Sequence, residues 1–250
     1  MIVRGPLGRR TALTVASTAA LAVLAAFVLT RQVTTRQGVN YEVTEHRVPL
    51  YVKAADFVNR SAQYEQIATE VAGDLPSGES RALAVFEWTR RNIRPTPEGV
   101  PVVDDHILNI ITRGYGQPDQ QADVFATLAT YAGVPAFWET LRVRESPGSL
   151  ILAFAQVGGR WRVFDVAAGL AYRNRHNELA TLEELREAPD MVPLPLRDLM
   201  VGTVSYGDRL KRATLPEVPD PLRAELQMPG ARLWHEVKAL LHLERDENVE

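Results

Sequence analysis

The chain contains no cysteine among its 250 residues. Disulfide bonds are therefore excluded, and so is any reaction that needs a protein thiolate, the strongest side-chain nucleophile near neutral pH. The absence does not fix the compartment, because proteins on either side of a membrane can lack disulfides. Lysine is also scarce and occurs only as Lys53, Lys211 and Lys238. We interpret this scarcity as a codon bias toward arginine and assign it no function.

Acidic residues outnumber basic residues beyond position 30. All 31 acidic residues follow position 30, whereas three of the 28 basic residues precede it, which leaves the remainder with a net charge of about −6. A surface of this sign does not attract a phosphate backbone, so we expect no nucleic-acid partner. The length beyond residue 30 suits one sizeable domain.

Charged residues are absent from Thr11 to Thr30, a run of 20 residues. At about 1.5 Å per residue, a helix of this length reaches the roughly 30 Å of a bilayer core. We therefore predict that residues 11–30 form a transmembrane anchor in the cytoplasmic membrane. Arginines in residues 1–10 predict a cytoplasmic N-terminus and a periplasmic or otherwise extracytoplasmic main domain. A cleavable signal peptide is the alternative, but its best cleavage triplet, residues 20–22, lies within the run and favours a retained anchor.

The middle of the chain has the apolar spacing of one helix followed by strands. The helix is predicted to begin at Asp119, a good N-cap residue type, and to end at Gly133. Residues 149–157 and 160–165 read as strands joined by a Gly-Gly turn, and residues 136–143 as a third strand. A long helix on a small antiparallel sheet belongs to the α+β class. The apolar helix face consists of Ala122, Phe125, Leu128, Ala129 and Ala132.

The remaining segments extend this core in both directions. Residues 31–60 are predicted as a linker with short strands, and residues 61–190 as the main domain. Residues 191–250 are predicted as a proline-rich extended segment that ends in a helix, because prolines interrupt most of it. The helices expected outside the core comprise residues 61–73, 79–92, 104–112, 181–187 and 231–243.

Two motifs within residues 114–165 carry a family resemblance. Residues 116–122 read GQPDQQA at the start of the helix, and residues 150–165 read LILAFAQVGGRWRVFD, a strand, a Gly-rich turn and a second strand. This spacing resembles the core of transglutaminase-like proteins, relatives of papain-type cysteine enzymes. In that family a Gly-x-Cys-x-x-x-Ala-type motif opens the helix, and a His and an Asp follow on two strands. The resemblance implies a transglutaminase-like, papain-like fold.

The catalytic positions of that family are largely replaced in this sequence. Pro118 stands at the cysteine position and Leu150 at the histidine position, and only Asp165 matches. The resemblance therefore implies a degenerate member, a pseudoenzyme without catalytic residues, and we expect no cofactor and no metal. We predict a binding or scaffold component of the cell envelope, with polysaccharide synthesis or export as one setting. Its expected partner is a protein, a peptide or an envelope glycan in the old substrate cleft.

An enzyme with substituted chemistry is the alternative. A hydrolase or transferase on the same fold would use Asp119 and Asp165 together with His106 or His176. Such an enzyme needs an acid or base whose pKa lies near its working pH, and a binding protein does not. Each histidine also has a simpler explanation as a solvated or helix-flanking residue.

Aromatic side chains are the remaining candidates for contact with a partner. Trp161 lies on a strand beside the hairpin turn, and we predict that it supports the fold. Most of the aromatic residues are expected to belong to the core. The candidates for a contact surface are Tyr115, Trp138, Trp161 and Trp234.

Overall fold

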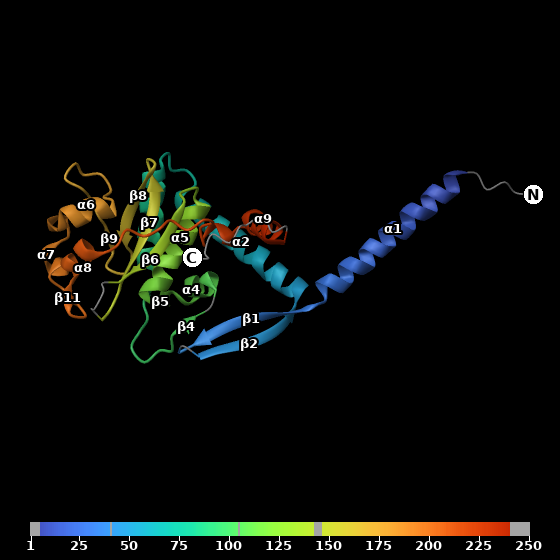
Figure 1. Cartoon of the computed structure of the whole chain (residues 1–250), viewed down its shortest axis with the longest axis horizontal. Helices are drawn as coiled ribbons and strands as arrows, with labels where there is room; N and C mark the ends of the chain where they lie inside the picture. The colour runs from blue at the N-terminus through green and yellow to red at the C-terminus, as the bar shows by residue number, and fades with distance from the viewer. Residues whose placement is uncertain (1–5, 41, 105, 143–146, 241–250) are drawn as a thin grey trace, which may run out of the picture.

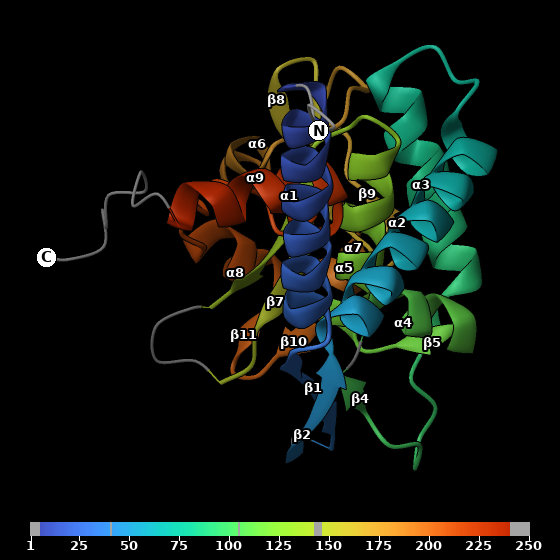
Figure 2. The ribbon, with the colours of Figure 1, turned by 90° about the vertical axis from the view of Figure 1, so that its right-hand side faces the viewer.

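The computed structural model describes residues 6–40, 42–104, 106–142 and 147–240 (Figure 1). Helix α1 (Pro6–Leu29) extends away from the remainder of the molecule. Figure 2 looks onto the side from which α1 leaves, with α9 (Pro229–Leu240) on one flank and α2 (Leu50–Ala72) and α3 (Gly78–Asn92) on the other. Across the described ranges, no helix combines the length and the apolar character needed to cross a membrane. The predicted span at residues 11–30 coincides with α1 and is not supported by this finding.

A hairpin and a long helix connect α1 to the core. Strand β1 (Gln32–Val39) pairs with β2 (Glu42–Pro49), and β4 (Val103–Asp104) adds to the other side of β1. Helix α2 (Leu50–Ala72) begins directly after the hairpin and not at residue 61 as predicted. Residues 50–59 contain apolar residues such as Tyr51, Val52 and Val58, but most of this stretch is exposed, so it packs little against the core.

The next helices surround α5 (Pro118–Tyr131), the predicted central helix. Helix α3 (Gly78–Asn92) starts with a capping box between Ser77 and Ser80. Helix α4 (Ile107–Arg113) ends at Gly114, whose φ of 72° is accessible to glycine without strain. The short strands β3 (Arg94–Pro95) and β5 (Tyr115–Gly116) pair in parallel just before α5.

The start of α5 differs from the prediction by two residues. Gln117 is the N-cap, and Pro118 lies inside the first turn, whereas we expected Asp119 to cap and Pro118 to lie outside. Proline fits the first helical position because the amide hydrogen it lacks would have no partner within the helix there.

Four antiparallel strands form the central sheet in the order β6-β7-β8-β9. As predicted, β7 (Leu150–Val157) and β8 (Arg160–Asp165) form a hairpin through two glycines of positive φ. Strand β6 (Ala136–Leu141) pairs with β7 and lies at one edge, and β9 (Leu170–Ala171) pairs with β8 at the other. The chain therefore mixes helices with an antiparallel sheet, as its sequence predicted.

The two faces of this sheet are buried in two separate cores. Alternate residues of β7 point to opposite faces, so Ala153 and Ala155 pack in the first core against α3 and α5, whereas Leu152 and Phe154 pack in the second. The first core also receives α2 and α4, and the second receives the segment that follows β9. Figure 1 shows these helices on the two sides of the sheet.

The segment after β9 contains more regular structure than predicted. Residues 191–250 were expected to be mainly extended before the terminal helix, but helix α8 (Tyr206–Arg212) packs its Tyr206 and Leu210 into the second core. Three prolines of this segment do not break its short helices, because each lies at a helix start. Pro189 begins one 3₁₀ turn, and Pro193 and Pro195 lie at the N-cap and in the first turn of the next helix. The elements are α6 (Leu182–Glu187), η1 (Pro189–Met191), α7 (Leu194–Arg197), β10 (Met200–Val201), β11 (Val204–Ser205), α8 (Tyr206–Arg212) and η2 (Glu225–Gln227).

Residues 214–224, which we call the strap, are extended for most of their length and connect α8 to η2. The strap leads from the second core toward the flank that carries α9 (Figure 1). Leu222 is buried in the second core, and Ala224 is also buried. The strap therefore links the second core to the helical side of the molecule.

Candidate functional site

The start of α5, where the family has its nucleophile, is occupied by Pro118, and this residue is exposed. The polar groups beside it are bonded to one another. The Gln117 amide donates to Gln120 Oε1 over 3.0 Å, and Arg113 Nη2 donates to the same oxygen over 3.0 Å. Gln120 Nε2 in turn donates to the Val103 carbonyl. These side chains fix the loop ahead of the helix, and none of them supplies a nucleophile.

Asp165, the residue that matches the family, is buried with 3% of its surface exposed. Tyr206 Oη donates to Oδ2 over 2.6 Å, and the Ala168 amide donates to Oδ1 over 2.8 Å. The Tyr206 hydroxyl is also hydrogen-bonded to the Tyr172 hydroxyl. Burial raises the pKa of Asp165, and the bond from Tyr206 partly opposes this rise. The carboxylate thus connects α8 with the turn between β8 and β9.

Sequence reasoning missed both tyrosines. Desolvation raises the pKa of each of them, so both hydroxyls stay protonated at neutral pH. Tyr206 lies 41 residues after Asp165, and no periodic pattern links the two positions. The one sequence signal for Tyr206 was its spacing of four residues from the apolar Leu210, which is compatible with a short buried helix face.

Leu150 lies on the face of the sheet that is turned away from α5. It belongs to the second core together with Tyr206, whereas its neighbour Ile151 packs against the first core. Asp165 shares the second face, since its carboxylate bonds to Tyr206. The structure therefore brings Leu150 and Asp165 to one layer, while Pro118 lies on the helix in the other layer. The side chains at the three triad positions therefore do not all lie on the same side of the sheet.

The substituted acid–base set is also spread over several elements. His106 precedes α4 and lines an open pocket beside Arg36, Glu45 and Lys53. His176 is exposed in a turn, where its amide donates to Asn174 Oδ1. Asp119 lies half-buried in the first turn of α5, and Asp165 lies in the second core.

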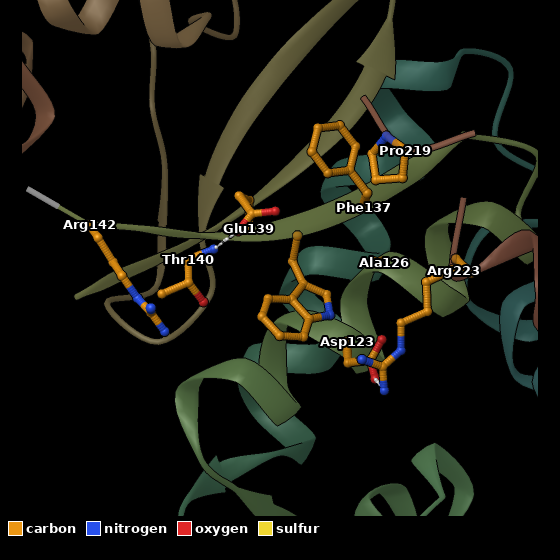
Figure 3. A pocket seen from close by; sticks show the side chains of 10 residues that line it. Asp123, Ala126, Phe137, Glu139, Thr140, Arg142, Pro219 and Arg223 are labelled. Atoms are coloured by element: carbon orange, nitrogen blue, oxygen red, sulfur yellow. Dashed lines mark hydrogen bonds and ion pairs between the residues drawn. The ribbon is translucent and has the colours of Figure 1, made fainter. Parts of the chain in front are cut away.

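A pocket of about 500 Å³ lies where α5, the edge strand β6 and the strap meet (Figure 3). This volume is within the range of small-ligand and peptide-side-chain sites, about 300–1,000 Å³. Arg142 and Arg223 lie at opposite sides of it in this view. It is lined by Asp123, Ala126, Phe137, Trp138, Glu139, Thr140, Arg142, Pro219, Arg223 and Ala224.

The charged groups of this pocket differ in how they are bonded. The nearly buried Asp123 carboxylate pairs with Arg223 Nη2 over 3.1 Å, and the Arg223 guanidinium carbon lies 5.9 Å from the centre of the Trp138 ring. The Glu139 carboxylate accepts the Thr140 amide over 2.8 Å. Arg142 is exposed, and the described part of the chain provides no ion-pair partner for it. Arg142 is thus the cation available to a ligand.

Within the described residues, no group of three or more His, Asp or Glu side chains is arranged to hold a metal ion.

No family model matches the sequence, and no curated protein matches it. Three solved structures are similar in part. A candidate cysteine protease from Cytophaga hutchinsonii aligns with 18% identity and a TM-score of 0.38 over 52% of this chain and 51% of its own. A candidate protease from Parabacteroides distasonis aligns with 12% identity and a TM-score of 0.35 over 53% of this chain and 35% of its own. A protein described as a TGase aligns with 10% identity and a TM-score of 0.34 over 64% of this chain and 50% of its own. The chain thus spans about half or less of the length of each.

Proposed function

We propose that the protein is a degenerate transglutaminase-like protein without enzymatic activity, which serves as a binding or scaffold component of the cell envelope. The residues at the family's catalytic positions support the loss of activity. Proline cannot attack a carbonyl and leucine cannot take a proton, and no thiol is present elsewhere in the chain.

The observation that carries this proposal is the environment of Asp165. In the family this carboxylate orients a histidine, but here it accepts hydrogen bonds from Tyr206 and Ala168 inside the second core. Both carboxylate oxygens are engaged, and the residue is almost fully buried. A general base must reach a proton of its substrate, and a carboxylate enclosed in this way cannot. Asp165 is therefore a structural residue.

Attachment to the membrane is the second part of the proposal. The uncharged run at residues 11–30 supports it, together with apolar side chains of α1 that face solvent, such as Val15, Val23 and Phe27 at 59–70% exposure. Arginines before the run support a cytoplasmic N-terminus and an extracytoplasmic domain. Polysaccharide synthesis or export is one setting for such a domain.

The absence of cysteine gives a direct test of this topology. A single cysteine introduced at Ile2 or at the exposed Gln156 is the only thiol of the chain. A membrane-impermeant maleimide applied to intact cells should label Gln156→Cys and spare Ile2→Cys. Labelling of neither variant in intact cells, but of both after lysis, would place the whole chain in the cytoplasm.

The loss of activity is tested with the unmodified full-length protein in a nonionic detergent. Incorporation of a fluorescent primary amine into casein and hydrolysis of labelled casein should both stay at the rate of the buffer blank. The matched variants are Asp119→Asn, His106→Ala and His176→Ala. Turnover by the unmodified chain that disappears in any of these variants would overturn the proposal and establish the substituted hydrolase or transferase in its place.

A further inference from the structure

Among the residues that the structure describes, no acceptor lies opposite the outward-facing amide of Trp138 on the exposed edge of β6. The Gln156 amide donates to the Pro135 carbonyl, which makes residues 135 and 156 a hydrogen-bonded pair of the β6–β7 ladder. Because such pairs alternate along an antiparallel ladder, Phe137 and Glu139 also bond to β7. The backbone N–H and C=O groups of Ala136, Trp138 and Thr140 therefore point away from the sheet.

Two of these three outward amides are occupied by side chains of the same chain. The Ala136 amide donates to Thr130 Oγ1 over 3.2 Å, and the Thr140 amide donates to the Glu139 carboxylate over 2.8 Å. The described part of the chain offers no acceptor for the Trp138 amide between them. The strap passes this edge without pairing with it, and the pocket of about 500 Å³ opens at this position.

We propose that this pocket binds an extended peptide that carries an acidic residue, and that the peptide adds as a short strand to β6 at Trp138. This inference rests on the binding role proposed above and names the ligand class. One peptide residue pairs with both the N–H and the C=O of Trp138, as in a hydrogen-bonded pair of an antiparallel ladder. A side chain of the peptide packs on the half-buried indole.

Arg142 offers a binding point for an acidic residue of the peptide. Asp123 and Arg223 neutralise each other, and the Glu139 carboxylate is bound to the Thr140 amide. Arg142 is left with an available guanidinium at one side of the pocket, which can hold a carboxylate in a bidentate pair (Figure 3). Because Ala136 and Thr140 already use their amides, the added strand is short and is fixed in register at Trp138.

The experiment begins with selection of a displayed library of random 12-residue peptides on the full-length protein in nonionic detergent. The recovered sequences should combine an acidic residue with an apolar one, and a fluorescein-labelled synthetic copy should bind with a Kd below about 1 mM by fluorescence anisotropy. Arg142→Gln should weaken binding at least tenfold. Arg91→Gln, an exposed arginine on α3, is the matched control and should change Kd less than twofold.

Backbone pairing is tested on the peptide itself. Methylation of the one amide nitrogen that bonds to the Trp138 carbonyl should weaken binding at least tenfold, and methylation of the adjacent amide should have little effect. Equal effects at all positions would refute strand addition, and so would the failure of any peptide to bind. Binding of chitin oligosaccharides in place of peptides, lost in Trp138→Ala, would show that the pocket is a glycan site.

These outcomes are separable from the proposed loss of activity. Absent peptide binding without turnover removes only the peptide inference, whereas turnover by the unmodified chain removes the pseudoenzyme proposal. Because Arg142 is exposed, Arg142→Gln should keep the thermal midpoint of the unmodified protein, and that midpoint is measured for every variant.

Discussion

Replacement of Tyr206 by phenylalanine removes one hydroxyl from the second core and leaves the ring in place. That hydroxyl donates to Asp165 Oδ2 over 2.6 Å and also meets the Tyr172 hydroxyl. The carboxylate is then left with backbone amides as donors in a buried position. Because a hydrogen bond to a charged group contributes about 1.5–3 kcal/mol, we expect Tyr206→Phe to lower the free energy of unfolding by about that amount where Asp165 is ionised.

The pH dependence of this effect follows from the pKa of Asp165. Burial raises that pKa in the folded protein above the value of about 4 that an aspartate has in an unfolded chain. Asp165 therefore contributes most to stability below pH 4 and less as the pH rises through the folded pKa. Tyr206→Phe removes a bond that lowers this pKa, so it should raise the pKa further. The loss of stability should accordingly be larger above the folded pKa than below it.

The assay is urea unfolding of the full-length protein in nonionic detergent at several pH values from 4 to 8. Tyr131→Phe is the matched control. The Tyr131 hydroxyl is hydrogen-bonded to the Ser61 hydroxyl and the Gln227 carbonyl, and neither partner is a carboxylate. The control should cost about 0.5–1.5 kcal/mol at every pH. A cost of Tyr206→Phe that equals the control and does not change with pH would refute the structural role assigned to Asp165.

Two further predictions concern packing and backbone conformation. Trp161 is half-buried and meets the Phe137 ring edge-on with centroids 5.0 Å apart, so Trp161→Ala should cost about 2–3 kcal/mol, less than the 3–5 kcal/mol of a fully buried tryptophan; an unchanged melting temperature would contradict this packing. Gly202→Ala should be more harmful than Gly158→Ala, although both glycines have φ near +65°. An added Cβ at Gly202 overlaps the Pro147 carbonyl, whereas the space beside Gly158 is open. We expect about 1 kcal/mol for Gly158→Ala and several-fold more for Gly202→Ala by the same urea assay, and equal costs would contradict the close approach of the two loops.

Much of the core could be predicted from local patterns. The apolar spacing of α5 and the two-glycine turn between β7 and β8 are properties of neighbouring residues, and both were confirmed. The first half of α2 was missed because residues 31–60 were assigned to a linker with short strands, although the stretch contains apolar residues such as Val52 and Val58. Helix α8 escaped because it is short and lies among prolines, and burial against the sheet holds it in place.

The candidate site depended more heavily on the tertiary structure. The assignment of Leu150 to the histidine position followed from counting residues, but the face of a strand residue is set by the register of the whole sheet. A shift of one residue turns a side chain to the opposite face of the sheet. Here Ile151 faces the first core, which contains α5, and Leu150 faces the second. The Trp138 pocket joins residues from α5, β6 and the strap, which no local pattern connects.

The sequence by itself determined that these 250 residues supply no thiolate, because composition is independent of folding. It also determined the positions of the central helix and hairpin, because those depend on neighbouring residues. The tertiary structure decided that Asp165 bonds to Tyr206 and that the Trp138 amide faces a pocket. Both facts depend on contacts between residues far apart in the chain. No local sequence pattern predicts such contacts, because they form only when the two cores pack.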